Sequence, residues 1–119
     1  MNENNTQVLF LPFPPSVNTY WGFSGHRRFL TKKAVHFKSE VALEVYNKKI
    51  KFDLERLEVM ITLFPPDKRI RDLDNFAKST LDALCQAKCF VDDSQIDLLI
   101  LRRGSIYKGG KAEVAIKII

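Results

Sequence analysis

Residues 71–78 of this chain hold the side chains with the clearest capacity for chemistry. The segment reads RDLDNFAK, so Asp72 and Asp74 lie two residues apart and Lys78 follows four residues after the second acid. A further acidic pair, Asp92-Asp93, comes about one helix length later. Carboxylates this close repel one another unless a positive charge lies between them. Because Mg2+ is a hard cation that binds oxygen ligands, the spacing indicates a metal site.

The charge of the chain is segregated along its length. Residues 72–97 contain six acids and two bases, a net charge of −4, whereas the remaining residues contain 17 bases and eight acids, a net charge of +9. A basic body favours phosphate backbones through the release of counterions. A protein of high pI without a nucleic-acid partner is the alternative interpretation. An acidic patch in a cationic protein favours an enzyme that acts on a polyanion.

The length of 119 residues fits one domain that spans 1–119, and an apolar content of 45% permits a real core. The apolar runs are far shorter than a membrane span. Residues 1–6 lack a basic region followed by an apolar segment, so we expect no signal peptide and a cytoplasmic protein.

The two cysteines, Cys85 and Cys89, are four residues apart and form no Cys-x-x-Cys motif. We expect both thiols to stay reduced, with Cys85 as a small core residue on a helix. A zinc site that adds His26 and His36 is the less favoured alternative.

The apolar periodicity predicts a two-layer α/β fold with the element order β-α-β-α-β-β, in which two helices pack on one small mixed sheet. Proline and glycine positions predict a long loop over Ser16–Thr31, and Thr31 is the expected N-cap of the first helix. The predicted strands cover Thr6–Phe13, Leu57–Phe64, Ser94–Arg103 and Lys111–Ile118, and the predicted helices cover Lys32–Lys51 and Asp72 or Leu73 to Ala87.

The second predicted helix arranges the acids relative to one another. Asp74, Lys78 and Asp82 occupy positions i, i+4 and i+8, so they form one polar stripe. Asp72 lies at the helix start, where its carboxylate can swing toward Asp74. If the strand that follows Asp92-Asp93 lies beside the helix start, three carboxylates converge there and can hold one or two Mg2+ ions.

Such ions activate a water molecule and stabilise the leaving oxygen in phosphodiester hydrolysis. Lys78 would then neutralise charge on the scissile phosphate or position the water. Each residue also has an ordinary structural explanation. Asp72 is a typical N-cap, Asp74 is a favourable first-turn acid, and Asp92-Asp93 is a typical turn. Asp82 is expected to be a solvated acid that pairs with Lys78.

The basic residues cluster around aromatic ones. Tyr20, Trp21 and Phe23 precede a basic segment, and aromatic rings can wedge or stack against bases at a branched DNA site. Core packing is the alternative, which we expect for at least one of the three. The predicted DNA-contacting residues are Arg27, Arg28, Lys32, Lys33, Arg69, Arg71, Lys108 and Lys111.

These motifs together resemble the RusA-type Holliday junction resolvases. The matches occur in the same order as in the family and span almost the whole chain. The acidic run with the downstream pair is specific, whereas the terminal motifs are weak alone. The matching residues are Arg71-Asp72-Leu73-Asp74-Asn75 with Lys78, Asp82-Ala83-Leu84, Val91-Asp92-Asp93-Ser94-Gln95, Pro14-Pro15-Ser16 with Asn18 and Tyr20, and Lys108-Gly109-Gly110.

The resemblance implies a Mg2+-dependent endonuclease, with Mn2+ as an alternative ion, that works as a homodimer on four-way DNA junctions and makes paired symmetric nicks. It implies Asp72, Asp74 and Asp93 as metal ligands, with Asp93 preferred to Asp92, and Lys78 as the catalytic lysine. It implies a role in DNA recombination and repair, a phage or prophage origin, no organic cofactor and no membrane partner. The family tends to have glycine where this chain has Lys88, which costs about 1 kcal/mol if that residue keeps a positive φ.

Three other functions fit the same residues. One is a non-catalytic protein that binds junctions or other branched DNA, which predicts binding without a Mg2+-dependent product. Another is a nuclease that acts on flaps or RNA. The last is a basic interaction module, which is excluded if affinity for junction DNA falls steeply with salt.

Overall fold

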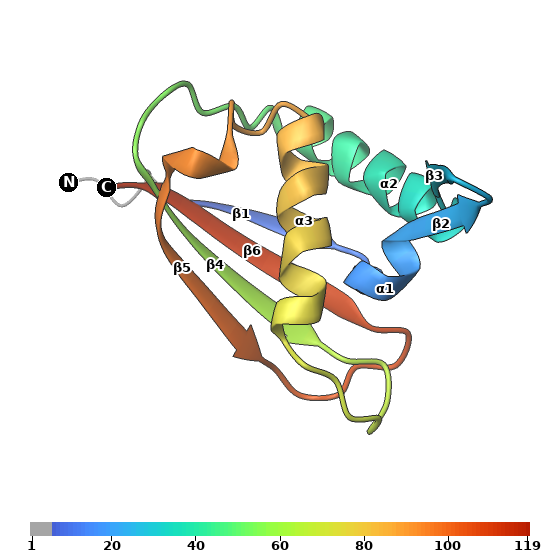
Figure 1. Cartoon of the computed structure of the whole chain (residues 1–119). Coiled ribbons are helices and arrows are strands. Elements are labelled where there is room, and N and C mark those ends of the chain that lie inside the picture. Colours follow the sequence, from blue (N-terminus) through green and yellow to red (C-terminus); the bar gives the residue numbers. More distant parts are fainter. Residues whose placement is uncertain (1–5) are drawn as a thin grey trace.

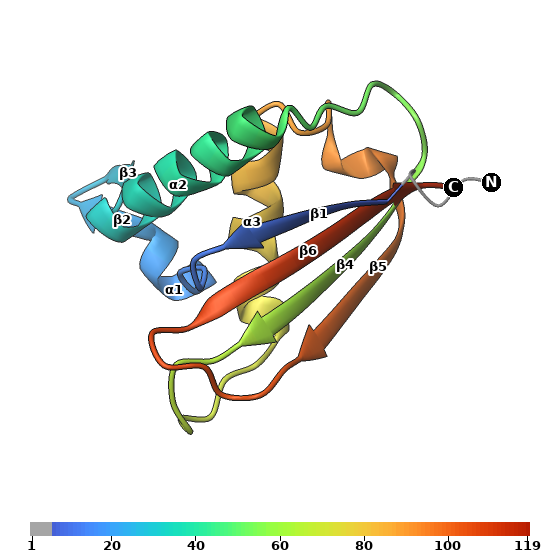
Figure 2. The ribbon, with the colours of Figure 1, turned by 180° about the vertical axis from the view of Figure 1, so that it is seen from behind.

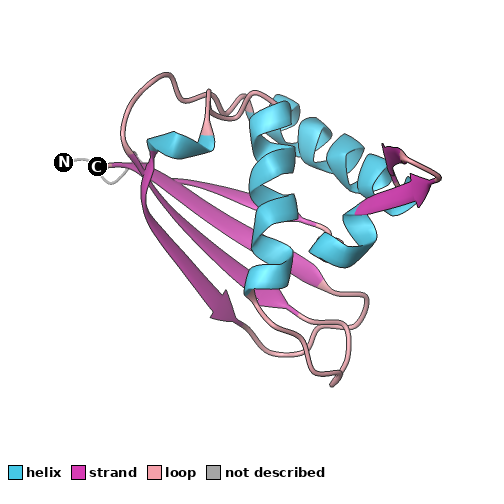
Figure 3. Cartoon of the chain, in the orientation of Figure 1, coloured by secondary structure: helices cyan, strands magenta, loops and turns pink. Residues whose placement is uncertain are grey.

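The computed structural model describes residues 6–119, so the N-terminal segment in which we expected no signal peptide lies largely outside the described residues. Helices are interspersed with strands along the chain (Figure 1 and Figure 3). The elements in order are β1 (Thr6–Leu11), α1 (Val17–Tyr20), β2 (Trp21–Ser24), β3 (Arg27–Leu30), α2 (Lys32–Lys48), β4 (Leu57–Phe64), α3 (Asp74–Gln86), the 3-10 helix η2 (Asp93–Gln95), β5 (Ile96–Arg103) and β6 (Lys111–Ile118).

The main sheet has the strand order β1-β6-β4-β5. β6 is antiparallel to both β1 and β4, whereas β4 and β5 are parallel, so the sheet is mixed. The long helices α2 and α3 lie on one face of this sheet, and the view from behind shows the other face uncovered (Figure 2). The predicted α/β architecture, with two main helices on a small mixed sheet, is confirmed.

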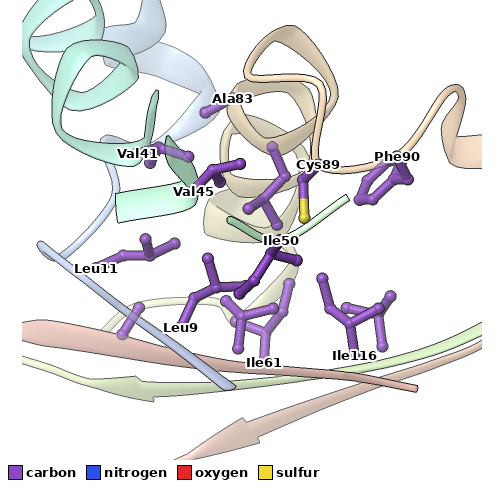
Figure 4. Packing of buried hydrophobic residues seen from close by; sticks show 14 of the residues in the cluster. Leu9, Leu11, Val41, Val45, Ile50, Ile61, Ala83, Cys89, Phe90 and Ile116 are labelled. Carbon is purple, nitrogen blue, oxygen red and sulfur yellow. The ribbon is translucent and has the colours of Figure 1, made fainter. Parts of the chain in front are cut away.

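The core lies between the sheet and the two helices (Figure 4). Alternate residues of β4 are fully buried and face the helices, as the period of two in a strand requires. α3 contributes Phe76 and Leu84 to the same layer. Cys89 is buried and Cys85 half-buried, and both are free thiols as expected. Between residues 6 and 119, no helix is long and apolar enough to cross a membrane.

The prediction of one long loop over Ser16–Thr31 is wrong. This segment forms the short helix α1 and the hairpin β2–β3, in which Phe23 pairs with Arg28. Gly25 adopts a φ of 63° in the tight turn between the two strands, so it was a turn signal inside a hairpin rather than evidence for a loop. The predicted N-cap is confirmed, because Thr31 Oγ1 accepts a hydrogen bond of 3.2 Å from the backbone N–H of Ala34.

Several element ends also differ from the predicted ones. β1 ends at Leu11 and α2 at Lys48, each earlier than the sequence indicated. α3 begins at Asp74, and β5 begins at Ile96 because the residues before it form η2. These shifts matter at the acidic residues, since they place Asp72 before the helix and Asp93 before the strand.

Candidate functional site

The start of α3 presents two free carboxylates. Asp72 lies in the turn that leads into the helix, and its carbonyl accepts a hydrogen bond of 3.1 Å from the backbone N–H of Asn75. The N-cap position is held by Leu73 and no side chain caps this helix, which excludes the alternative explanation of Asp72 as an N-cap. Asp72 and Asp74 are exposed, and within residues 6–119 neither carboxylate forms an ion pair or hydrogen bond. Both remain available as ligands.

The loop before this helix is held by an ion pair. Arg71 Nη1 lies 2.8 Å from Asp67 Oδ1, and the side chain of Arg71 is only 14% exposed. The hydrogen bond from Arg71 is the main cause that lowers the pKa of Asp67, and the backbone N–H of Arg69 adds to it. The Arg71 guanidinium therefore fixes the chain ahead of Asp72. Of the two arginines predicted to contact DNA here, Arg69 is the more accessible, with 82% of its side chain exposed.

The polar stripe of α3 differs from the prediction at Asp82. Its Oδ2 accepts a hydrogen bond of 2.5 Å from the hydroxyl of Tyr20 in α1, and it does not pair with Lys78. Burial of Tyr20, followed by its bond to Asp82, raises the pKa of that phenol. The contact fixes α1 against α3. Lys78 stays exposed one turn after Asp74, without an ion pair among residues 6–119.

The two acids of the downstream pair have different surroundings. Asp92 is the N-cap of η2, where its side chain accepts a hydrogen bond of 3.0 Å from the backbone N–H of Ser94. Hydrogen bonds from the Ser94 side chain, and then from its backbone, lower the pKa of Asp92. Asp93 is exposed, and no described residue bonds to its carboxylate. Asp92 therefore has a structural role in the loop, whereas the Asp93 carboxylate has no bonded partner among residues 6–119.

Gln95 holds this loop in place, a role that the sequence did not reveal. The side chain is 3% exposed. Its Oε1 accepts from the backbone N–H of Val91 at 2.8 Å and of Asp92 at 2.9 Å. Its Nε2 donates to the carbonyls of Asp53 at 2.6 Å and Glu55 at 2.9 Å. One amide thereby joins the Asp93 segment to the loop before β4.

Replacing Gln95 by leucine is expected to lower the free energy of unfolding by at least about 3 kcal/mol. Four backbone groups lose their partner, and each buried unpaired group costs about 1–3 kcal/mol. Urea denaturation would measure the change, with Gln86→Leu on the exposed face of α3 as the matched control. Equal stability of the two variants would contradict this role for Gln95.

The helix end before this loop contains a strained residue. Lys88 has a φ of 67°, as expected from its position where the family tends to have glycine. The backbone N–H of Cys89 donates to Leu84 O and that of Lys88 to Cys85 O, each at 3.0 Å, which is the Schellman pattern. The helix therefore ends in the expected geometry despite the lysine.

The substitution Lys88→Gly is expected to raise the free energy of unfolding by about 1 kcal/mol, because glycine adopts a left-handed conformation without strain. Thermal or urea denaturation would show the gain. Lys88→Ala removes the same charge but keeps the strain, so it should give no gain. If both variants were stabilised equally, the gain would come from removal of the lysine charge rather than from relief of backbone strain.

The acids at the two ends of α3 do not meet in one chain. η2 packs beside the end of α3, as Figure 1 shows, whereas Asp72 and Asp74 lie at its start. A helix of 13 residues is roughly 20 Å long. Within residues 6–119 no three His, Cys, Asp or Glu side chains lie close enough to hold a metal ion. The expected convergence of three carboxylates is therefore not formed within a single copy.

The structure places the basic residues at two locations. Arg27 and Arg28 lie on β3 and Lys32 and Lys33 in the first turn of α2, and all four are exposed. The guanidinium of Arg28 stacks on Trp21, 3.9 Å from the ring centre. Lys108 and Lys111 lie at the other location, in and after the turn between β5 and β6.

The three aromatic residues Tyr20, Trp21 and Phe23 differ in how deeply they are buried. Tyr20 is 4% exposed and belongs to the core, which confirms the expectation for at least one of them. Trp21 is half-buried beneath Arg28, and Phe23 is 72% exposed on the hairpin. Phe23 alone presents most of its ring to solvent.

The two weak motifs of the sequence meet beside the start of α3. Gly110 has a φ of 74°, and a Cβ added there would lie 2.8 Å from Phe13 Cβ, so only glycine fits this close approach. Phe13 in turn packs on Phe76, with ring centres 5.1 Å apart. A groove of about 410 Å³ runs along this junction, and Lys33, His36 and Arg71 contribute its basic lining. The terminal motifs thus build the surface next to Asp72.

Comparisons with known proteins point to one class, the endodeoxyribonucleases. The family model of endodeoxyribonuclease RusA matches residues 12–119. The crossover junction endodeoxyribonuclease of Enterobacteria phage HK97 is 34% identical over 113 residues, which cover 94% of each chain. Those of Escherichia coli K12 and of Enterobacteria phage 82 are 32% and 31% identical, and the Escherichia coli match also covers 94% of each chain.

The chain belongs to the endodeoxyribonuclease RusA family, which confirms the predicted family and the predicted enzyme class. Among solved structures, the periplasmic domain of Helicobacter pylori MotB superposes with a TM-score of 0.44 at 12% identity, covering 98% of this chain and 76% of that chain. That likeness carries no argument about function.

Proposed function

We propose that the protein is a Mg2+-dependent endonuclease that resolves four-way DNA junctions, as a homodimer, by paired symmetric nicks. The observation that carries the proposal is the pair of free carboxylates at the start of α3 in a chain of the RusA family. The relatives are named as crossover junction endodeoxyribonucleases over nearly their whole length. The proposed substrate is DNA, and the proposed location of the protein is the cytoplasm.

The residues present fit a hard divalent cation. Asp72 and Asp74 offer oxygen donors that no described residue occupies, and they lie on either side of the turn into α3. Mg2+ is usually bound through one or two carboxylates together with water and substrate phosphate, and such a pair satisfies that requirement. When bound, the ion would activate the attacking water and stabilise the leaving oxygen, and Mn2+ would be an alternative.

A second copy of the chain would complete the site. Asp93 lies at the opposite end of α3 from Asp72 and Asp74, so one copy does not supply all three proposed ligands. A two-fold axis exchanges equivalent positions between two copies, which allows the Asp93 of each to approach the helix start of the other. Two such sites also suit a four-way junction, because its approximate two-fold symmetry requires two related cuts.

Lys78 is the proposed residue that acts on the scissile phosphate. It is exposed, unpaired among residues 6–119 and one turn from Asp74. An ammonium group there stabilises the negative charge that develops on the phosphate. The Asp82 carboxylate is bonded to the Tyr20 hydroxyl and, among residues 6–119, forms no ion pair with Lys78, which leaves the ammonium group accessible.

Basic side chains around this stripe are the proposed contacts to the DNA backbone. α1 packs on α3 and is followed directly by the hairpin that carries Arg27 and Arg28. Lys32 and Lys33 lie in the first turn of α2, Arg69 lies in the loop before α3, and Lys108 and Lys111 lie in and after the turn between β5 and β6. Arg71 is the weakest member of the predicted set, because Asp67 already holds its guanidinium.

Cleavage of a labelled synthetic four-way junction tests the function. The assay compares the junction with a linear duplex of the same arms, with a flap and with an RNA junction, in Mg2+, Mn2+ or EDTA. We expect paired symmetric nicks in the DNA junction alone and none in EDTA. Tight junction binding without cutting would replace this proposal with the binding-only function, and cutting of flaps alone would change the substrate.

A further inference from the structure

The groove of about 410 Å³ beside the start of α3 combines an apolar floor with a basic rim. Four prolines and three phenylalanines supply most of its lining, whereas Lys33, His36 and Arg71 supply the basic side chains. Among residues 6–119, no acidic side chain lines the groove. Its volume lies in the range of ligand sites, which is about 300–1,000 Å³. A flat apolar ring that carries an anion would match both the floor and the rim.

Contacts between distant segments hold the groove in shape. Ser79 Oγ of α3 donates a hydrogen bond of 2.6 Å to the carbonyl of Pro15, which fixes the proline segment. The backbone N–H of Tyr107 donates to the carbonyl of Pro65 at 2.9 Å, which ties the turn before β6 to the chain after β4. The groove is therefore formed without a ligand, as ligand sites in proteins usually are.

The groove lies next to the proposed metal ligands. Arg71 lines it and Asp72 follows directly in the chain, while Phe76 lines it from the first turn of α3, which begins at Asp74. The hydrogen bond of 2.8 Å from Arg71 to Asp67 keeps the guanidinium in place. A group bound in the groove is therefore a neighbour of a phosphate held at the start of α3.

We propose that the groove binds one nucleotide of the cleaved strand, next to the scissile phosphate, with its base unpaired and lying on the apolar floor. This inference rests on the proposed function and names the part of the DNA that the groove takes. Base rings stack on aromatic and apolar side chains. The phosphate of that nucleotide lies at the rim, where the side chains of Lys33 and His36 are exposed and, among residues 6–119, form no ion pair or hydrogen bond.

An unpaired nucleotide also suits a four-way junction. Taking a base out of the stack costs least where pairing or stacking is already interrupted, as it is at the crossover. A continuous duplex has to lose a stacked base pair first. The groove therefore favours a cut at the crossover over a cut within an arm.

Nuclear magnetic resonance of the two histidines tests the binding directly. His36 lines the groove, whereas His26 lies in the turn between β2 and β3, so the His26→Gln variant assigns the imidazole signals. In EDTA, a deoxydinucleotide with a 5′-phosphate should shift the His36 signals saturably, at a concentration at least about tenfold lower than inorganic phosphate requires. The His26 signals are the control for attachment to the basic hairpin and should not saturate.

Other occupants of the groove would give different results. If inorganic phosphate and the dinucleotide act at the same concentration, the groove holds an anion only and the proposal is wrong. If the His36 signals change with protein concentration but not with the dinucleotide, a second copy of the chain fills the groove. The absence of any saturable shift at His36 would overturn the proposal as well.

Removal of a base from the substrate tests the same contact during cleavage. Two junctions, each without one of the bases that flank the cut, are compared with the intact junction. One of them should lose about tenfold in kcat/KM with the wild type, because the stacking of one base is lost. The same removal should have little further effect with His36→Glu, which places a negative charge at the rim and excludes the phosphate.

Ser39→Glu is the matched control for this comparison. Ser39 is exposed, lies three residues after His36 on α2 and does not line the groove. This variant should respond to base removal as the wild type does, and circular dichroism would check that both variants are folded. An equal loss in the wild type and in His36→Glu would overturn the proposal.

The outcomes separate the groove from the function. A wild type that cuts junctions, without a His36 shift and without an effect of base removal, retains the proposed function and excludes the nucleotide from the groove. A wild type whose His36 signals shift with the dinucleotide but which makes no Mg2+-dependent cut retains nucleotide binding and excludes the proposed nuclease.

Discussion

The substitution Asp74→Asn is expected to reduce cleavage of a four-way junction by about a thousandfold or more, because the loss of a metal ligand removes several kcal/mol of transition-state stabilisation. Folding should be nearly unchanged, since the side chain is exposed and unpaired among residues 6–119. The lost interaction with the helix dipole costs at most about 1 kcal/mol. Single-turnover cleavage and gel-shift binding would measure the two properties separately.

Binding of the junction should be retained or become tighter, because a negative charge near the phosphates is removed. Asp53→Asn is the matched control, as Asp53 is also exposed but lies in the loop before β4. Cleavage by Asp74→Asn at the wild-type rate would locate the metal site elsewhere on the chain.

Two inactive variants are expected to restore cleavage when they share one dimer. In a dimer of one Asp74→Asn chain and one Asp93→Asn chain, one of the two sites combines both substitutions, whereas the other retains all its proposed ligands. The mixed dimer can be isolated by giving each chain a different affinity tag. It should contain about half as many intact sites as the wild-type dimer, since each site takes residues from both copies. The product should be a single nick rather than a resolved junction.

The choice of pair provides the control. Asp72 and Asp74 lie at the same end of α3, so a dimer of Asp72→Asn and Asp74→Asn chains contains no intact site and should stay inactive. No recovery in the Asp74 and Asp93 pair would show that each site is built within one chain. Recovery in this control would show that Asp72 and Asp74 of one chain serve different sites.

The elements that carry the acids could be predicted because their signals are local. The apolar spacing along residues 73–85 requires a helix with one buried face, and it left Asp74 and Lys78 on the other face as observed. The alternation in Leu57–Phe64 predicted β4 with its observed bounds. Local periodicity was therefore sufficient to predict elements of both the helix layer and the sheet layer.

What could not be predicted depends on contacts between distant segments. The packing of α1 on α3 is one such contact, because the bond from Tyr20 to Asp82 joins residues 62 positions apart in the sequence. The separation of Asp93 from Asp72 follows from the packing of η2 beside the end of α3 rather than its start, and the spacing of residues along the chain does not determine that position. The buried bonds of Gln95 likewise join residues about 40 positions apart.

α2 protects the outer side of β1, which is an edge strand of the main sheet. The backbone N–H of Phe10 donates to Glu44 Oε2 at 2.8 Å, and Lys48 Nζ donates to the carbonyl of Val8 at 3.1 Å. Another chain that added a strand at this edge would have to displace both side chains. Glu44 and Lys48 therefore oppose growth of the sheet into an open-ended fibre at this edge.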